Sequence, residues 1–293
     1  MTQSTTTSQT ELINTEVIDK LIIGYPSDDD TVCGYFRTRS LIGLATKVAS
    51  FPRWVKDAHE DLSTEATDMT ATELETTEVQ VTAARIGLAR NPTETLFDDS
   101  VLGRNGLLAA IAMDTTILFN MAQCEDGAAL FASATGSVSD TGQAIEIADL
   151  VAGMGSQRRQ KVRGPQVIHL HDYQLQQLQA AQAAATATPW ATFYTPNADS
   201  TAFGGYFMGA PIWSSSLNPT ANASADRVGC IWTQGQAPGA ELFCAFGYVL
   251  ARNPQTKSQD VILSDSTMIA TTKRYGVGVI AANYATALTF RNS

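Results

Sequence analysis

A long acidic stretch between two strand-like segments constrains this chain more than any other feature. Residues 57–78 carry eight carboxylates and no Lys or Arg, with many threonines among them. The preceding residues 46–54 (TKVASFPRW) predict a strand, which Pro52 restricts to an edge or an end of a sheet. From Thr77 onward apolar and polar residues alternate, which predicts a second strand. Two strands around such a stretch indicate a long hairpin whose tip has too few apolar groups to fold alone, so it needs an external surface.

The composition describes a folded chain that shows little charge to water. Of 293 residues, 44% are hydrophobic and 16% are charged, which indicates that copies of the chain cover much of its surface. The net charge of −10 argues against a protein that holds nucleic acid by neutralising phosphates. The N-terminus has neither a basic start nor an apolar core, so we predict no secretory signal. No apolar run reaches the roughly 20 residues of a membrane span.

The four cysteines predict a reducing compartment. They are far apart in the sequence and form no C-x-x-C pair. Buried free thiols are therefore expected in preference to a disulfide framework or a zinc site. The four are Cys33, Cys124, Cys230 and Cys244.

Helices are predicted in the middle of the chain and strands on both sides of it. A short helix is expected near residues 11–23, and the alternation from Thr77 slips near Arg85, as a β-bulge would allow. A long helix is predicted over about 101–122, with Leu107, Ile111, Thr115, Leu118 and Ala122 on one stripe. The order of strands, then helices, then strands predicts an α+β fold.

Two further helices are expected after the long one. Asp140 is a good N-cap, and a helix that begins there is expected to bury Ala144, Ile147, Ala148 and Val151. A strand at 166–170 (QVIHL) is followed by a helix at 173–185 that Asp172 is expected to cap. Residues 205–213 (GYFMGAPIW) predict short strands, and the last thirty residues are also strand-rich.

No residue pattern in the sequence supports catalysis or a cofactor. His169 and His171 share one face of a predicted strand, but zinc normally needs three or four ligands, and a strand end before a helix explains both residues. Gly276 and Gly278 match a loose dinucleotide fingerprint, yet no acidic residue follows at the required distance. The acidic stretch lacks the spacing of a calcium loop. We therefore assign no catalytic, cofactor-binding or metal-binding residue and predict that the chain is not an enzyme.

Taken in order, these segments resemble the major capsid proteins of tailed bacteriophages, which have the Hong Kong-97-type fold. The segments that carry the resemblance are VASFPRW, EVQVTAARIGLA, LLAAIAMDTTILFNMA, GGYFMGAPIWSSSLNP and KRYGVGVIAANYATALTF. The resemblance implies an N-terminal arm (1–48), an extension-loop hairpin (49–84), a peripheral domain with a spine helix (85–137 and a return strand at about 258–275), and an axial domain (138–257 and closing strands at about 276–293).

The resemblance also implies what the acidic hairpin does. In such shells the hairpin lies across an adjacent subunit, so its acidic residues would meet basic residues of another copy. Exchange of four or more of Glu65, Asp68, Glu73, Glu75 and Glu78 for Lys is expected to impair the assembly of shells but not the folding of the subunit. We expect inter-subunit contacts at Glu65, Asp68, Glu73, Glu75, Glu78, Arg37, Arg53, Arg104, Arg158, Arg159, Lys161 and Arg163. Further candidate basic partners are Arg39 and Arg90. The charge-poor region 187–240 is expected to line contacts within a capsomer.

The expected role is therefore structural. Pentamers and hexamers of the chain would form an icosahedral shell in the virion, assembled in the host cytoplasm, around double-stranded DNA that is not bound specifically. We expect a separate scaffolding protein because the sequence reaches its arm directly after Met1. A portal is a further expected partner and a cement protein an optional one, and no membrane is expected. Because Lys56 is the hairpin's lysine and lies at its base, no covalent cross-link is predicted.

Three other functions remain open at this point. An encapsulin-like nanocompartment would have the same fold but enclose a cargo enzyme. A zinc-dependent hydrolase would use His169 and His171. A tail or fibre component would fit the Thr, Ser, Gly and Asn content, although the long helix and the uncharged third helix argue against it.

Overall fold

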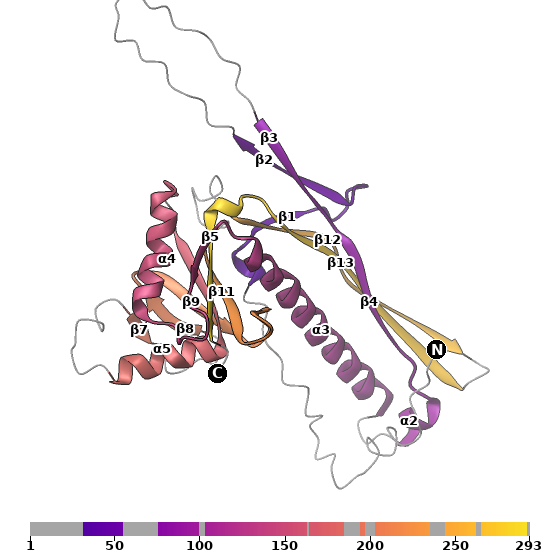
Figure 1. Ribbon diagram of the computed structural model, residues 1–293. Helices are drawn as coiled ribbons and strands as arrows, with labels where there is room; N and C mark the ends of the chain where they lie inside the picture. Colours follow the sequence, from indigo (N-terminus) through magenta and orange to yellow (C-terminus); the bar gives the residue numbers. More distant parts are fainter. Residues whose placement is uncertain are drawn as a thin grey trace, which may run out of the picture.

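The computed structural model describes residues 32–54, 76–99, 103–162, 164–184, 194–196, 203–234, 244–261 and 265–291. Figure 1 shows two lobes joined side by side, one with a long helix beside long strands and one with two helices against a larger sheet. A two-stranded hairpin leaves the body at one end of the long strands. This mixture of helices and sheets confirms the α+β prediction.

A four-stranded sheet and the long helix form the first lobe. The sheet has the order β1-β12-β13-β4, in which β1 is parallel to β12 and the other neighbours are antiparallel. The helix α3 runs along this sheet in Figure 1, with the short α2 near its start. The bounds are β1 (Arg37–Ser40), β4 (Ala84–Arg90), β12 (Phe246–Val261), β13 (Ser266–Val279), α2 (Glu94–Asp99) and α3 (Gly103–Ala129). The predicted long helix is confirmed and is longer than expected.

The second lobe is a larger sheet covered by two helices. Its strands have the order β5-β14-β11-β6-β9-β8-β7, and β10 pairs with β11. The bounds are β5 (Gly136–Ser139), β6 (Gln166–His171), β7 (Tyr194–Pro196), β8 (Phe203–Phe207), β9 (Ala210–Ser215), β10 (Thr220–Ala221), β11 (Asp226–Thr233), β14 (Ala285–Arg291), α4 (Ile147–Arg159) and α5 (Asp172–Ala184). Short 3-10 helices η1 (Cys33–Tyr35), η2 (Leu130–Ser133) and η6 (Ala282–Tyr284) complete the described elements.

The extension hairpin has the strands that the sequence predicts. β2 (Val48–Trp54) pairs only with β3 (Thr76–Thr82), and Pro52 lies opposite Glu78 in this two-stranded sheet. Because β2 has one strand neighbour, Pro52 costs no hydrogen bond on a second side. The predicted edge position is therefore confirmed.

A core of aromatic side chains joins the two lobes. Trp232 of the larger sheet and Phe246 of the four-stranded sheet both pack on Phe131 of η2, and the Phe131 and Trp232 ring centroids are 5.3 Å apart. All three side chains are buried, so the junction removes much apolar surface from water. A second core lies between the larger sheet and α4 and α5, and includes Leu150 and Leu178.

The helix predicted to begin at Asp140 begins seven residues later. Residues Asp140 to Gln143 form a turn in which Gly142 has a φ of +74°, a backbone conformation that ends a helix. The helix α4 instead starts at Ile147, where the Asp149 carboxylate accepts a hydrogen bond from the Glu146 amide at 2.8 Å. The predicted burial was wrong for Ala144, Ala148 and Val151, which are exposed, and right for Ile147.

Two other local predictions need correction. The slip near Arg85 is not a bulge, because the chain leaves the hairpin at Ala83 and enters a different sheet at Ala84. The helix α5 begins at Asp172, but the group that accepts a hydrogen bond from the Tyr173 amide is the His171 imidazole nitrogen Nδ1. A buried side chain thus takes the role expected for the aspartate.

One helix in the described part of the chain, over Gly106–Ser133, is long and apolar enough in composition to cross a membrane. The segment is not an unbroken apolar run, and it meets this criterion through its length and mean hydropathy. In this fold the segment lies against β13, and its side chains hydrogen-bond to that strand.

Candidate contact surfaces

Two glycines let the hairpin lie directly on the four-stranded sheet. A Cβ atom at Gly276 would lie 2.3 Å from the Thr82 carbonyl oxygen, and one at Gly278 would lie 2.7 Å from a Val81 methyl carbon. Real Cβ atoms do not approach other atoms so closely, so only glycine fits at these positions. The glycine pair therefore serves close packing of two strands, in agreement with our rejection of a dinucleotide fingerprint.

Apolar side chains fix the base of the hairpin. Phe51 and Val81 face the four-stranded sheet and are buried, as is Ile280 beyond the end of β13. The other buried members of this cluster are Leu41, Ala49, Ala83, Cys244 and Val249. The base is thus part of the fold of a single chain, and its strands β2 and β3 extend beyond the body (Figure 1).

Three arginines surround this base and contact their own chain. The guanidinium carbons of Arg37 and Arg39 lie 5.8 and 5.9 Å from the centroid of the Phe51 ring. Arg53 lies 5.7 Å from the Tyr284 ring centroid and donates a long hydrogen bond of 3.5 Å to Asn283 Oδ1. Such cation–π contacts help hold the hairpin against the body. The expected contacts of Arg37 and Arg53 with a second copy remain predictions.

The other residues expected at subunit contacts are distributed over both lobes. Glu78 lies exposed in β3, and Arg158 and Arg159 lie exposed in the last turn of α4, just before the exposed Lys161. Arg104 belongs to the first turn of α3. Glu65, Asp68, Glu73, Glu75 and Arg163 lie outside the described residues, as does the predicted helix near 11–23.

The four-stranded sheet has two distinct faces. The helix face carries side chains that contact α3, such as Lys273 and Tyr275. The hairpin face is the opposite one, where Gly276 and Gly278 meet the hairpin. Because side chains alternate along a strand, Arg274 belongs to the hairpin face.

A buried polar cluster ties the helix face to α3. The Gln123 side-chain oxygen accepts hydrogen bonds from the Lys273 ammonium and from the Tyr248 hydroxyl, the latter at 3.0 Å. The Tyr275 hydroxyl donates to the Asp126 carboxylate at 2.6 Å. Burial, followed by this hydrogen bond and the charge of Asp126, raises the pKa of Tyr275. The lysine is only 7% exposed, so these partners are what make its burial tolerable.

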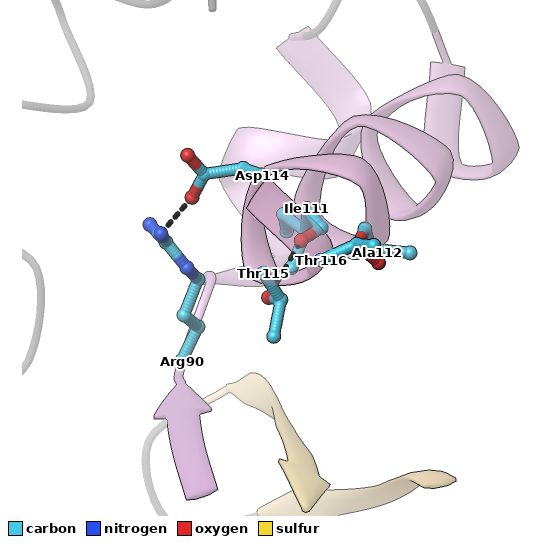
Figure 2. A network of polar contacts seen from close by, with 6 residues as sticks. All are labelled: Arg90, Ile111, Ala112, Asp114, Thr115 and Thr116. Atoms are coloured by element: carbon cyan, nitrogen blue, oxygen red, sulfur yellow. Dashed lines mark hydrogen bonds and ion pairs between the residues drawn. The ribbon is translucent and has the colours of Figure 1, made fainter. Parts of the chain in front are cut away.

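A second tie joins α3 to the end of β4. Figure 2 shows the Arg90 side chain reaching from the strand to Asp114 on the helix, and the two form an ion pair. On the next two helical residues, the Thr115 hydroxyl donates to the Ile111 carbonyl at 2.7 Å and the Thr116 hydroxyl to the Ala112 carbonyl at 2.9 Å. Each hydroxyl is therefore satisfied within the helix itself.

The two histidines of HLHD are core residues. His169 is completely buried, with its ring centroid 5.5 Å from that of Phe131, and His171 is stacked on Tyr173 at 5.2 Å. Among the residues that the structure describes, no group of three His, Cys, Asp or Glu side chains gathers to hold a metal ion. A hydrolase that uses His169 and His171 thus finds no third ligand in the described part of the fold.

The four cysteines are buried thiols that form no disulfide with one another, as predicted. Burial raises the pKa of the Cys230 and Cys244 thiols, and in Cys244 the nearby Arg37 opposes this rise. Thiols in such surroundings stay protonated and unreactive. They fill space in the core.

Apolar groups reach the surface near the turn between β8 and β9. Tyr206 is 51% exposed and Met208 is 43% exposed, and Met208 has a positive φ of +50°. An open pocket of about 550 Å³ lies beside them, lined in part by Tyr35, Phe203 and Trp213. Leu44, in the loop before the hairpin, is 61% exposed. Large exposed apolar side chains are typical of surfaces that other chains cover.

Comparison with solved structures identifies the fold. The chain is similar to a structure from Mycobacterium phage Che8, with a TM-score of 0.68 and 12% identity over 92% of this chain and 94% of that one. It is also similar to the capsid of the cyanophage P-SCSP1u (TM-score 0.64, 12% identity, 95% and 94% covered). The capsid of a native GTA particle gives a TM-score of 0.63 at 12% identity, with 93% of both chains covered. Neither a scan against family models nor a search of curated proteins found a match.

These likenesses define the class of fold. The chain has the Hong Kong-97-type fold of phage capsid structures, and the likeness extends over nearly its whole length. The fold predicted from the sequence is confirmed.

Sequence reasoning missed one arrangement of basic residues. The sheet register places Arg85, Arg274 and Arg252 directly opposite one another on three adjacent strands. Arg85 and Arg252 have no charged neighbour in the sequence and Arg274 has only Lys273 beside it, so no run of charges marks them. Only the pairing of β4 with β13 and of β13 with β12 brings them together.

Proposed function

We propose that this chain is the major capsid protein of a tailed phage and assembles into the icosahedral shell that encloses a double-stranded DNA genome. The observation that supports this most is the likeness to capsid structures over 92–95% of the chain. A subunit of a closed shell needs surfaces that contact its neighbours, and this chain has a projecting hairpin (β2 and β3) and exposed apolar side chains. The role requires no catalytic residue.

The mechanism that we propose is assembly through many moderate contacts. A stable interface buries on the order of 1,000 Å² or more, and symmetry repeats it around the shell, so no single contact need be strong. The extension hairpin of one copy lies on the next and carries its acidic stretch to basic groups there. The charge-poor surface between residues 187 and 240 lies against neighbours within a pentamer or hexamer.

We further propose the division of the chain and its partners that the sequence suggested. Residues 1–48 form an arm, 49–84 the extension hairpin, and 85–137 with about 258–275 the peripheral domain. Residues 138–257 with about 276–293 form the axial domain, so that the border near 257 falls within β12. Assembly takes place in the host cytoplasm with a separate scaffolding protein and a portal, and a cement protein is an optional further partner. The shell holds DNA without binding it specifically.

Electron microscopy of the overexpressed protein in negative stain tests the proposal. We expect closed shells of uniform size, alone or with the scaffolding protein co-expressed. Shells purified from infected cells that contain double-stranded DNA support the genome container. Shells that enclose an enzyme and no DNA would instead identify a nanocompartment, and open fibres would exclude a head protein.

A further inference from the structure

A row of three arginines crosses the hairpin face of the four-stranded sheet. Arg85 in β4 is paired with Arg274 in β13, which is paired in turn with Arg252 in β12. Side chains directly opposite each other on neighbouring strands have Cβ atoms about 4.5–5.5 Å apart. Lys257 projects from the same face further along β12, opposite Ala270. We call Arg85, Arg252 and Arg274 the arginine row.

The arginine row is unfavourable for the isolated chain. Like charges directly opposite each other on a sheet destabilise it. No described carboxylate forms an ion pair with these three residues, and the ladder positions of this face around them hold no Asp or Glu. The Nε atoms of Arg252 and Arg274 are buried without a hydrogen-bond partner, although Arg252 reaches Thr272 with another nitrogen. The described part of the chain therefore supplies no ion-pair partner for the charges of the row.

The hairpin face is open where the row lies. The hairpin covers the other end of the face, where the lack of a side chain at Gly276 and Gly278 allows it to pack closely. Arg85 and Lys257 are exposed, and Arg252 and Arg274 are half-buried. The sheet thus presents an anion-binding surface with planar guanidinium groups, which match carboxylates in geometry.

The acidic stretch of a second copy is the anion that the chain itself supplies. Its eight carboxylates at 57–78 contain no Lys or Arg, and the net charge of −10 makes a nucleic acid the weaker candidate. In Figure 1, β3 and β4 follow one another in nearly one line, so the hairpin points away from its own row. Thr76 is nine residues from Arg85, which corresponds to about 30 Å along extended strands. A neighbouring copy can bring its hairpin to the row directly.

We propose that the arginine row of one subunit is the docking surface for the acidic stretch of the extension hairpin of a second copy. This inference rests on the proposed function and names the receptor that the function leaves open. It differs from the sequence prediction, which placed the receptor partly at Arg158, Arg159 and Lys161. Repulsion among the three arginines destabilises the isolated subunit, and the carboxylates of a second copy relieve this repulsion when copies assemble.

Neutralisation of the row tests the proposal in the full-length chain. One variant carries Arg85→Gln, Arg252→Gln and Arg274→Gln, and a matched control carries Arg158→Gln, Arg159→Gln and Lys161→Gln. For the row variant we expect roughly a tenfold rise in the subunit concentration needed for shells, the change that about 1.4 kcal/mol produces. Its dissociated subunit should resist urea at least as well as the wild type, because the repulsion is gone. Added salt should weaken wild-type shells more than those of the row variant.

A cysteine pair provides a readout that does not depend on shell yield. Arg274→Cys combined with Glu75→Cys is expected to form disulfide-linked dimers in shells under mild oxidation, whereas Arg158→Cys with Glu75→Cys is not. Disulfide-linked dimers that form with the Arg158→Cys and Glu75→Cys pair but not with the Arg274→Cys and Glu75→Cys pair would overturn the proposal. The same conclusion would follow if the row variant formed shells with the concentration and salt dependence of the wild type. Loss of binding to a labelled DNA duplex with unchanged shells would assign the row to phosphate instead. If the wild type itself forms no shells, the proposed function fails, and the row is not at issue.

Discussion

At the scale of single residues, glycines and buried polar groups decide how the parts meet. Gly276 has the Thr82 carbonyl where a side chain would begin, so the contact between hairpin and sheet depends on the missing Cβ. Tyr275, one residue earlier, points to the other face and binds Asp126 of the helix. Adjacent residues of β13 therefore hold two different elements in place.

Replacement of Gly276 by alanine should weaken the subunit. The new Cβ would lie 2.3 Å from a backbone oxygen, which cannot move without shifting the hairpin. We expect a loss of about 1–3 kcal/mol in the free energy of unfolding, measured with urea. Gly34→Ala is the matched control, since nothing lies within 4 Å of its added Cβ. Equal stability of the two variants would contradict the close packing described here.

The pH dependence of stability should reveal Tyr275. Burial and Asp126 raise its pKa, so the folded chain keeps the phenol proton at a pH where the unfolded chain, with a pKa of about 10, has lost it. This contribution is complete below pH 10 and is lost as the pH rises above it. The stability advantage of the wild type over Tyr275→Phe should therefore be constant up to about pH 9 and shrink as the pH rises above about 10. The exposed Tyr173→Phe serves as control, and a constant advantage for Tyr275 would refute the assignment.

At the scale of elements, α3 is held to the sheet at several points along its length. Near its middle the Arg90–Asp114 ion pair joins it to β4. Further along, Gln123 and Asp126 bind the side chains of β12 and β13. The helix and the long strands thus behave as one unit.

The Arg90–Asp114 pair should contribute little to stability by itself. Its side chains are 36% and 20% exposed, and partly exposed pairs are screened by water and salt. A double-mutant cycle with Arg90→Gln and Asp114→Asn should give a coupling energy of about 0.2–1 kcal/mol that falls as salt is added. A coupling energy several times larger would contradict this prediction and would mean that the ion pair is a major contribution to the packing of α3 against the sheet.

The sequence predicted these elements where local pattern dominates, and it failed where distant contacts decide. The alternation after Thr77 and the stripe at Leu107 were sufficient to predict the hairpin and α3. The start of α4 was missed because Asp140 has the chemistry of a cap, while the left-handed Gly142 ends any helix there. The arginine row could not be predicted because it depends on strand pairing between residues nearly 190 positions apart in sequence (Arg85 and Arg274).

At the scale of the whole molecule, charge is separated within a single chain. The hairpin sequence carries a run of carboxylates, while the hairpin face of the sheet carries three arginines in register. No carboxylate among the described residues forms an ion pair with these arginines. In the assembly proposed above, a chain built in this way gains stability from its copies.

Sedimentation velocity of the purified protein, measured over a range of concentrations at low and high salt, tests this central claim most directly. The account predicts that subunits collect into large closed particles as the concentration rises, and that high salt shifts this assembly to higher concentrations. A stable monomer that persists unchanged at the highest concentration in low salt would contradict it.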